Sequence, residues 1–441
     1  MIVKFRKYDS YKDSGVEWLS DIPVGWDAVK MKYLFKDVSI KNKPDEALLS
    51  VTQNMGVVPR SWVENRMVMP SGGLDAFKYL EKGDFSISLR SFEGGLEYCH
   101  HHGIISPAYT VLKKRNDLIA EYYKYLFKSK SFIYEMQTSI VGIREGKNIS
   151  YPILSYSLLP VPDSNEQTAI ANFLDEKTAK IDKVIAQKEK MIALLKERKQ
   201  ILIQNAVTGK VVWNEKENAW TKPEKVKDSG VEWIGEIPEG WEVKKVKHVS
   251  SKIGSGITPS GGGDTYLDEG GIPLLRSQNV HFGKVDLSDV ARIRPETHDS
   301  MANSKVKFGD ILLNITGGSI GRCHYMDLKG EFNVNQHVCI IRPKCINTVY
   351  FNYLFVSEVG QGQIWFYQQG GGREGLNFQA IKNFFIPNPS IKEQDKIVSY
   401  INMQSYRFEK AITLQQTQIQ KLKEYKAVLI DSAVTGKIKV S

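Results

Sequence analysis

The sequence predicts an α/β (α+β) protein made of two similar halves, in which two mixed domains are separated and joined by two long antiparallel coiled-coil helices. Three observations support this fold. A long amphipathic stretch occurs twice, a tryptophan-containing motif opens both halves, and the middle regions share short similar segments. These features together indicate an internal pseudo-two-fold repeat.

The long amphipathic stretch occupies residues 165–210 and returns at the C-terminal end of the chain, with a constant offset of 227 positions from Glu166 to Glu393 and from Ala206 to Ala433. Its apolar residues recur at steps of seven, four and three, which places them on one face of a helix. With no Gly or Pro inside, each stretch predicts a helix of about 40 residues, or roughly 60 Å. The positions expected to pack helix on helix are Leu174, Ile181, Ile185, Ile192, Leu195, Leu202, Ile401, Phe408, Ile412, Ile419, Leu422 and Leu429.

Both stretches end in the same sequence, AVTGK, where Gly209 and Gly436 can take the left-handed conformation that closes a helix. Two helices with the same apolar face bury it most simply against each other, as an antiparallel pair. The alternative is that each helix packs separately on its own domain.

A motif of the form SGVEWxxxIPxGW opens each half, at residues 13–26 and 228–241. Its two tryptophans beside a fixed proline favour a clasp that holds the chain on a domain surface, while stacking on a nucleobase is the functional alternative. The predicted segments are a first domain at 1–164, a central helix at 165–210, a second domain at 211–390 and a C-terminal helix at 391–441.

The two middle regions share a scaffold but differ in their loops. The shared pieces are a turn and strand at 82–89 and 308–315, a short core helix at 122–129 and 350–357, and a Gly-x-Arg-Glu-Gly segment at 142–149 and 371–378. The divergent loops are 41–60 and 93–103 in the first domain, and 254–271 and 276–285 in the second. Such a pattern is expected of two readers of different targets, although drift of the loops would produce it as well.

Composition favours a polyanionic partner in the cytoplasm. Lys and Arg number 60 and Asp and Glu number 50, a formal net charge of +10, and such an excess favours nucleic acid. There is no run of about 18 apolar residues and no signal-peptide core, so we expect no membrane contact. The four cysteines lack paired spacing, which agrees with a reducing compartment.

Catalytic and metal-binding motifs are largely missing. The Gly254 and Gly142 segments both depart from phosphate-binding fingerprints. Asp163 with Asp175, Glu176 and Lys177 imitates the spacing of a metal-dependent nuclease, but the repeat carries Ser390 and Asn402 in place of the two aspartates. Two cysteine and histidine groups, Cys99 to His102 and Cys323, His324, His337 and Cys339, lack standard metal-ligand spacing. We therefore expect no catalytic residue, no metal site and no cofactor in this chain.

Positive and amide side chains in the middle regions are the candidates for binding DNA. Arg can pair with guanine and Asn or Gln with adenine in the major groove, while Lys commonly holds phosphates. For any single residue, a solvated charge or a scaffold contact is the alternative. The candidates are Arg60, Arg66, Arg90, His101, Arg144 and Lys147 in the first domain, and Arg276, Gln278, Asn279, Arg292, Arg322 and Arg373 in the second.

The two opening motifs, two variable domains and two long helices ending in AVTGK together resemble the specificity subunit of a type I restriction-modification system. Residues 257–280 and 43–60 each resemble a recurrent type of target-recognition domain in that family. The resemblance implies that each domain reads one half of a bipartite, asymmetric site in double-stranded DNA, and that the helices set the gap between the halves.

The resemblance further implies that two modification (methyltransferase) subunits dock on the chain, and that restriction subunits can join them. S-adenosylmethionine and ATP with Mg²⁺ would then be bound by those partner subunits, and this chain would not be an enzyme. Two alternatives remain. A protein-binding adaptor, with two domains on a rigid helical strut, predicts no salt-sensitive DNA binding. A nuclease predicts Mg²⁺-dependent cutting by the isolated chain.

Overall fold

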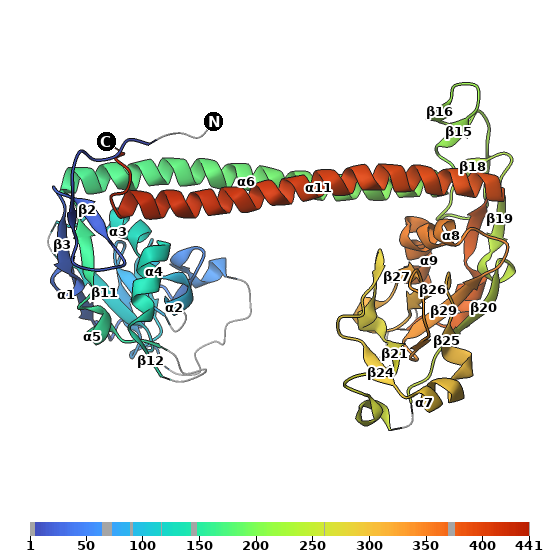
Figure 1. Ribbon diagram of the computed structural model, residues 1–441, viewed down its shortest axis with the longest axis horizontal. Coiled ribbons are helices and arrows are strands. Elements are labelled where there is room, and N and C mark those ends of the chain that lie inside the picture. Colours follow the sequence, from blue (N-terminus) through green and yellow to red (C-terminus); the bar gives the residue numbers. More distant parts are fainter. Residues whose placement is uncertain are drawn as a thin grey trace. The chain divides into compact units, whose positions relative to one another are not determined.

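The computed structural model describes residues 5–63, 73–88, 91–115, 117–142, 148–259, 261–368 and 375–440 (Figure 1). The chain divides into two compact units, of which the first comprises residues 1–189 with 415–441 and the second comprises residues 190–414. Each unit combines an α+β domain with a segment of both long helices, α6 (Ser164–Val207) and α11 (Ile391–Val434).

The first domain is centred on a four-stranded antiparallel sheet in the order β4-β11-β8-β9. Its strands are β4 (Phe35–Val38), β11 (Thr110–Lys114), β8 (Phe85–Ile87) and β9 (Glu97–Tyr98). Helices α3 (Ala120–Leu126) and α4 (Lys130–Gln137) follow the sheet in the chain. Phe35 lies 5.6 Å from Phe85 and 5.1 Å from Tyr123 between ring centroids, in edge-to-face geometry, so aromatic rings join sheet to helix in this core.

Shorter elements complete the first domain. They are β1 (Tyr11–Asp13), β2 (Asp21–Pro23), β3 (Asp27–Lys30), α1 (Met31–Leu34), β5 (Leu49–Thr52), β6 (Gly56–Pro59), η1 (Arg60–Trp62), β7 (Lys78–Leu80), α2 (Ser91–Gly94), β10 (Gly103–Ile105), β12 (Ile140–Val141), β13 (Asn148–Ile149), α5 (Tyr151–Leu154) and β14 (Leu158–Val161). The hairpin of β5 and β6 packs beside β9 and β10, where it makes bridges at Val57 to Cys99 and at Leu48 to Ile104.

The second domain has a central sheet with the corresponding strand order, β20-β29-β26-β27. These strands are β20 (Ser250–Ser255), β29 (Val338–Pro343), β26 (Ile311–Asn314) and β27 (Cys323–Tyr325). A further four-stranded sheet contains β24 (Ala291–Ile293), β21 (Ile272–Leu275), β28 (Phe332–Val334) and β25 (Lys305–Val306). Leu275, Val334 and Ile340 bury their side chains in one core cluster, which joins the two sheets.

The remaining elements of this unit include two helices with buried faces, α8 (Thr348–Val356) and α9 (Glu358–Tyr367). The others are β15 (Val212–Asn214), β16 (Ala219–Thr221), β17 (Val226–Asp228), β18 (Glu236–Pro238), β19 (Glu242–Lys245), η3 (Val246–His248), η4 (Gly262–Thr265), η5 (Ser277–Asn279), β22 (Val280–His281), β23 (Lys284–Val285), α7 (Pro295–Ser300), η6 (Ala302–Ser304), η7 (Gly317–Ser319), α10 (Phe378–Asn383) and β30 (Phe385–Asn388). The strand predicted at 308–315 and the helix predicted at 350–357 are therefore both present.

The opening motif is a clasp, as predicted for its tryptophans. Trp26 and Trp241 are 1% and 2% exposed, so neither ring offers a face to a nucleobase. The Trp26 Nε1–H donates to Glu166 at 2.8 Å, and the Trp241 Nε1–H donates to Glu393 at 3.3 Å. Each motif thereby fixes the first turn of a long helix to its own domain.

The far end of each long helix is closed by a glycine that the fold requires. Gly209 and Gly436 have φ angles of 73° and 76°, in the left-handed region predicted for them. A Cβ atom at Gly209 would lie 2.3 Å from Pro238, and one at Gly436 would lie 2.4 Å from Pro23. Any larger residue would therefore displace the opening motif from the helix end.

Within each unit, the segments of α6 and α11 run antiparallel. In the first unit Lys426 pairs with Asp182 at 2.6 Å, and in the second Lys199 pairs with Glu409 at 2.7 Å. None of the apolar stripe positions is exposed. Leu174, Ile181, Ile185, Ile401, Ile419 and Leu429 are buried, and Ile192, Leu195, Leu202, Phe408, Ile412 and Leu422 are half-buried. Among the described residues, no helix has both the length and the apolar character needed to cross a membrane.

Candidate nucleic-acid interface

Several loops of the second domain meet at one edge of its two sheets. Ser255 at the end of β20 pairs with Cys339, and Asn314 at the end of β26 pairs with the neighbouring Val338. The Gly256 N–H donates to the Asn335 carbonyl at 3.1 Å, which brings in the loop after β28. We call the loops at 256–259, 261–266, 276–279, 315–322 and 335–337 the loop edge.

Polar and positive side chains gather on the loop edge. The Arg276 guanidinium lies 5.8 Å from the centroid of the Tyr266 ring, and its buried Nε has no hydrogen-bond partner within the described segments. His337 contacts Thr316 at 2.7 Å through Nδ1 and Gln336 at 3.0 Å through Nε2. Side chains of this kind can donate to and accept from base edges and phosphates.

A buried asparagine that sequence reasoning missed holds two parts of the loop edge together. The Asn314 side chain donates to the Ser277 carbonyl at 2.8 Å, and the Asn314 N–H donates to the Arg322 carbonyl at 2.9 Å. Asn314 is fully buried, so it fixes the backbone beside Arg276 and Arg322. The signal available was an amide at the end of an otherwise apolar strand sequence, ILLN.

The RSQN segment at 276–279 contains both exposed side chains and a buried one that supports the loop. Asn279 is 2% exposed; its amide accepts from the Arg276 N–H at 2.9 Å and donates to the Asp286 carbonyl at 3.0 Å. Asn279 is thus a loop brace, and the sequence-based interpretation of it as a base contact is corrected. Gln278 is exposed, but its amide donates to the Asp289 carboxylate at 2.7 Å.

The remaining second-domain candidates differ in position. Arg322 precedes β27 and is half-buried at the loop edge. Arg292 lies within β24, opposite Pro273, and its Nη1 lies 3.4 Å from the Gly271 carbonyl. The structure therefore brings Arg276 and Arg322 together and leaves Arg292 on a strand of the further sheet.

In the first domain, the two divergent loops predicted at 41–60 and 93–103 lie beside each other. Trp62 is 61% exposed, and its ring lies 5.1 Å from the His101 ring in edge-to-face geometry. Arg60 is the first residue of the short helix η1, which ends at this tryptophan, and its N–H donates to the Leu48 carbonyl. Five further candidates lie outside the described residues, namely Arg66, Arg90, Arg144, Lys147 and Arg373.

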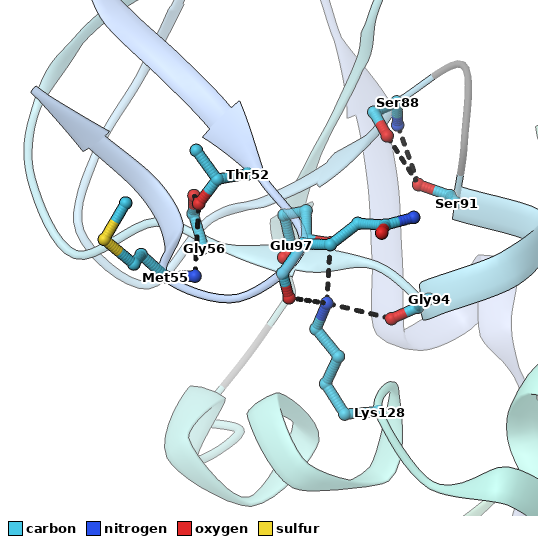
Figure 2. A network of polar contacts seen from close by, with 9 residues as sticks. Thr52, Met55, Gly56, Ser88, Ser91, Gly94, Glu97 and Lys128 are labelled. Atoms are coloured by element: carbon cyan, nitrogen blue, oxygen red, sulfur yellow. Dashed lines mark hydrogen bonds and ion pairs between the residues drawn. The ribbon is translucent and has the colours of Figure 1, made fainter. Parts of the chain in front are cut away.

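An ion pair between the buried Glu97 and the half-buried Lys128 holds the first domain's loops (Figure 2). Lys128 Nζ lies 2.6 Å from Glu97 Oε1 and also donates to the carbonyls of Gly94 at 2.9 Å and Gln53 at 3.2 Å. Glu97 is fully buried, and burial raises its pKa while burial lowers the pKa of Lys128. One ammonium thus joins α2, β9 and the turn between β5 and β6.

The groups first considered for metal or nuclease chemistry have structural contacts. Cys323 and Cys339 are fully buried on the strands that flank β26. Asp175 accepts from Lys124 at 2.7 Å and from the Tyr125 hydroxyl at 2.5 Å. In the described part of the chain, no three His, Cys, Asp or Glu side chains are placed to share a metal ion.

The family model and the relatives that match this chain all describe the specificity component of type I restriction systems. The family model described as "Type I restriction modification DNA specificity domain" matches residues 238–424. The type I restriction enzyme EcoBI specificity subunit of Escherichia coli is 32% identical over 259 residues, which cover 57% of this chain and about half, 52%, of that relative. The MjaVIII specificity subunit of Methanocaldococcus jannaschii is 26% identical over 347 residues, 77% of this chain and 75% of the relative.

A solved structure shares the fold. A chain from a study of complex assembly and conformational transition of the type I R-M system aligns with a TM-score of 0.69 at 14% identity. The alignment covers 94% of this chain and 98% of that chain, so the similarity of fold extends over both domains and both long helices.

Proposed function

We propose that this chain is a specificity subunit of a type I restriction-modification system, as its matches to that family's DNA specificity domain and to specificity subunits support, and that it reads a bipartite, asymmetric DNA site, one half with each domain. In this proposal the long helices set the gap between the half-sites, and the chain is the non-catalytic DNA-recognition subunit of a larger complex.

The loop edge of the second domain carries the proposal for DNA. Arg276 and Arg322 flank one buried brace, Asn314, so two guanidinium groups extend from backbone that is fixed in place. Base readout needs such preorganised side chains, because each bidentate contact contributes roughly 1–3 kcal/mol of discrimination only when its geometry is held. In the first domain, Trp62 and His101 mark the corresponding candidate surface.

The helices are the proposed ruler. Each has 44 residues, or roughly 66 Å at 1.5 Å per residue, whereas successive major grooves on one face of a duplex recur about every 34–36 Å. Their apolar stripe favours continuous antiparallel packing, as in a coiled coil. Such a pair would hold two readers at a fixed separation along DNA.

Other subunits would supply the chemistry. Two methyltransferase subunits would dock on the chain, bind S-adenosylmethionine and transfer a methyl group to the N6 of adenine. Restriction subunits, where present, would add ATP- and Mg²⁺-dependent translocation and cleavage. The chain itself would hold no cofactor and would work in the cytoplasm.

Methylome sequencing tests this function. Cells that express the chain with its neighbouring methyltransferase would show methyladenine at one bipartite motif, and cells with the methyltransferase alone would not. If both proteins are folded and expressed and no chain-dependent motif is found, the proposal is wrong and a protein-binding adaptor becomes the better interpretation.

A further inference from the structure

A groove of about 650 Å³ lies in the second unit, between α8 and the segments of α6 and α11. α8 contributes Asn352 and Tyr353, and α11 contributes Asn402 and Ser405. His324 of β27 also lines it. The lining residues of α8 recur within one face of the helix, at Val349, Asn352, Tyr353 and Val356, so a helix face forms this wall.

Three polar atoms in these walls have no hydrogen-bond partner among the residues that the structure describes. They are His324 Nδ1, Asn352 Oδ1 and Ser405 Oγ, and their residues are 6%, 4% and 7% exposed. Because His324 Nε2 lies 3.4 Å from the Asp327 carboxylate, a proton on Nε2 leaves Nδ1 as an acceptor. A buried polar atom without a partner is destabilising, so an occupant that donates hydrogen bonds would be stabilised here.

The first domain fills the corresponding position with its own cation. Lys124, which aligns with Asn352, donates to Asp175 at 2.7 Å and lies 4.6 Å from the centroid of the Tyr125 ring. The Tyr125 hydroxyl contacts both Asp175, at 2.5 Å, and Thr178, at 3.2 Å. The Lys124 ammonium, the Asp175 carboxylate and the two hydroxyls thus form one hydrogen-bonded group.

The second domain keeps the tyrosine and a neighbouring hydroxyl of this arrangement, while amides replace both the cation and the carboxylate. Tyr353 aligns with Tyr125, and its hydroxyl donates to Asn402 at 2.6 Å, where Asn402 aligns with Asp175. Ser405 stands in place of Thr178, and the shorter Asn352 replaces Lys124. An aromatic ring and several acceptors therefore lie where the first domain holds Lys124, and Asn352 supplies no ammonium there.

We propose that this groove binds an arginine or lysine side chain of a partner protein, in the place that the Lys124 ammonium takes in the first domain. A guanidinium or ammonium group presents only donors, which match Asn352 Oδ1, His324 Nδ1 and Ser405 Oγ. The Tyr353 ring adds a cation–π contact of the kind that Tyr125 makes with Lys124. In the first domain the Lys124 side chain takes this place, so the two halves differ at this position.

The surroundings of the groove fit a protein rather than a small molecule. Phe282 and Tyr406 line it and are 50% and 57% exposed. An adjoining cavity of about 780 Å³ shares Phe282 and adds Ile201 and Trp365, which are 52% and 65% exposed. Exposed aromatic and aliphatic groups around a pocket for a cation are typical of the anchor region of a protein interface.

The test rests on the proposed function, because it uses the methyltransferase subunit as the partner. The double variant Asn352→Lys, Asn402→Asp reproduces the ion pair of the first domain and leaves the net charge unchanged. We expect it to lower the affinity of the full chain for the methyltransferase subunit by about tenfold or more, as loss of an interface anchor does. Its melting temperature should not fall, because the new lysine fills the groove.

A matched control makes the reverse change in the first domain. Lys124→Asn with Asp175→Asn also leaves the net charge unchanged, and we expect it to retain the affinity for the methyltransferase subunit. Ser405→Ala removes only one hydroxyl and should weaken binding several-fold. It tests the groove independently if the double variant does not fold.

The outcomes separate the two proposals. If the unaltered chain does not bind the methyltransferase subunit in titration calorimetry, the proposed function fails and this inference fails with it. If the unaltered chain binds, and the groove variants bind equally well, the groove is not the docking site although the proposed function stands.

Discussion

Lys426 of α11 lies 2.6 Å from the Asp182 carboxylate of α6, and the repeat offset of 227 positions maps this ion pair onto Lys199 and Glu409, which lie 2.7 Å apart. Each unit therefore pairs its helix segments in the same register. Both pairs are partly exposed, so each contributes at most about 1 kcal/mol. They mark the register, while the buried apolar stripe supplies the stability.

The ion pair of the half-buried Lys128 with the buried Glu97 gives a prediction about stability. Lys128→Met should lower the free energy of unfolding by about 3–5 kcal/mol, because it leaves the Glu97 carboxylate buried without its charge partner. Adding Glu97→Gln should restore part of this loss. Chemical denaturation measures both values, and Lys180→Met serves as the control, since the Lys180 pair with Glu176 is exposed and helix-local. A loss equal to that of the control would contradict the assigned role.

Arg276 gives a prediction about specificity. Arg276→Ala should relax the second half-site and cost about 1–3 kcal/mol of discrimination, because a base contact is lost, while the first half-site stays as it was. Arg294→Ala is the control, because Arg294 is exposed directly before α7 and away from the described loop edge. Methylation rates on matched and mismatched DNA measure the effect. If both variants weaken all sequences uniformly, Arg276 contacts phosphate instead.

His324 gives a prediction about pH. Burial lowers the pKa of His324 below its usual 6.5, against the opposing effect of Asp327. The unfolded chain takes up this proton first, so stability is full above pH 6.5 and is lost as the pH falls toward the lower folded pKa. The free energy of unfolding should therefore fall between pH 7.5 and 5, and His324→Gln should reduce the slope. An equal slope in the variant would show that other groups cause it.

The long helices and the opening motif could be predicted from sequence because their signals are local. Apolar spacing fixes a helix face, and a glycine after AVT closes it at Gly209 and Gly436. The repeat itself identified matching pieces of the two scaffolds, including the strands that became β8 and β26.

The site could be predicted only in outline, because side-chain roles depend on distant partners. Asn279 and Gln278 are adjacent amides that look equally suited to contact DNA in the sequence, yet the buried Asn279 side chain donates to a loop carbonyl. Asn314 and Lys128 act on segments 31 or more residues away. The groove at Asn352 could be recognised only from the structures of both domains, since only the contacts of Lys124 show which group the second domain lacks.

The most direct test of two readers on a helical ruler is to lengthen both helices. Four residues, about one turn or roughly 5.4 Å, would be inserted after Glu189 in α6 and after Gln416 in α11, which leaves both ion pairs intact. Methylome sequencing should then show the same two half-sites with a gap longer by one or two base pairs. An unchanged gap, or altered half-sites, would contradict the account.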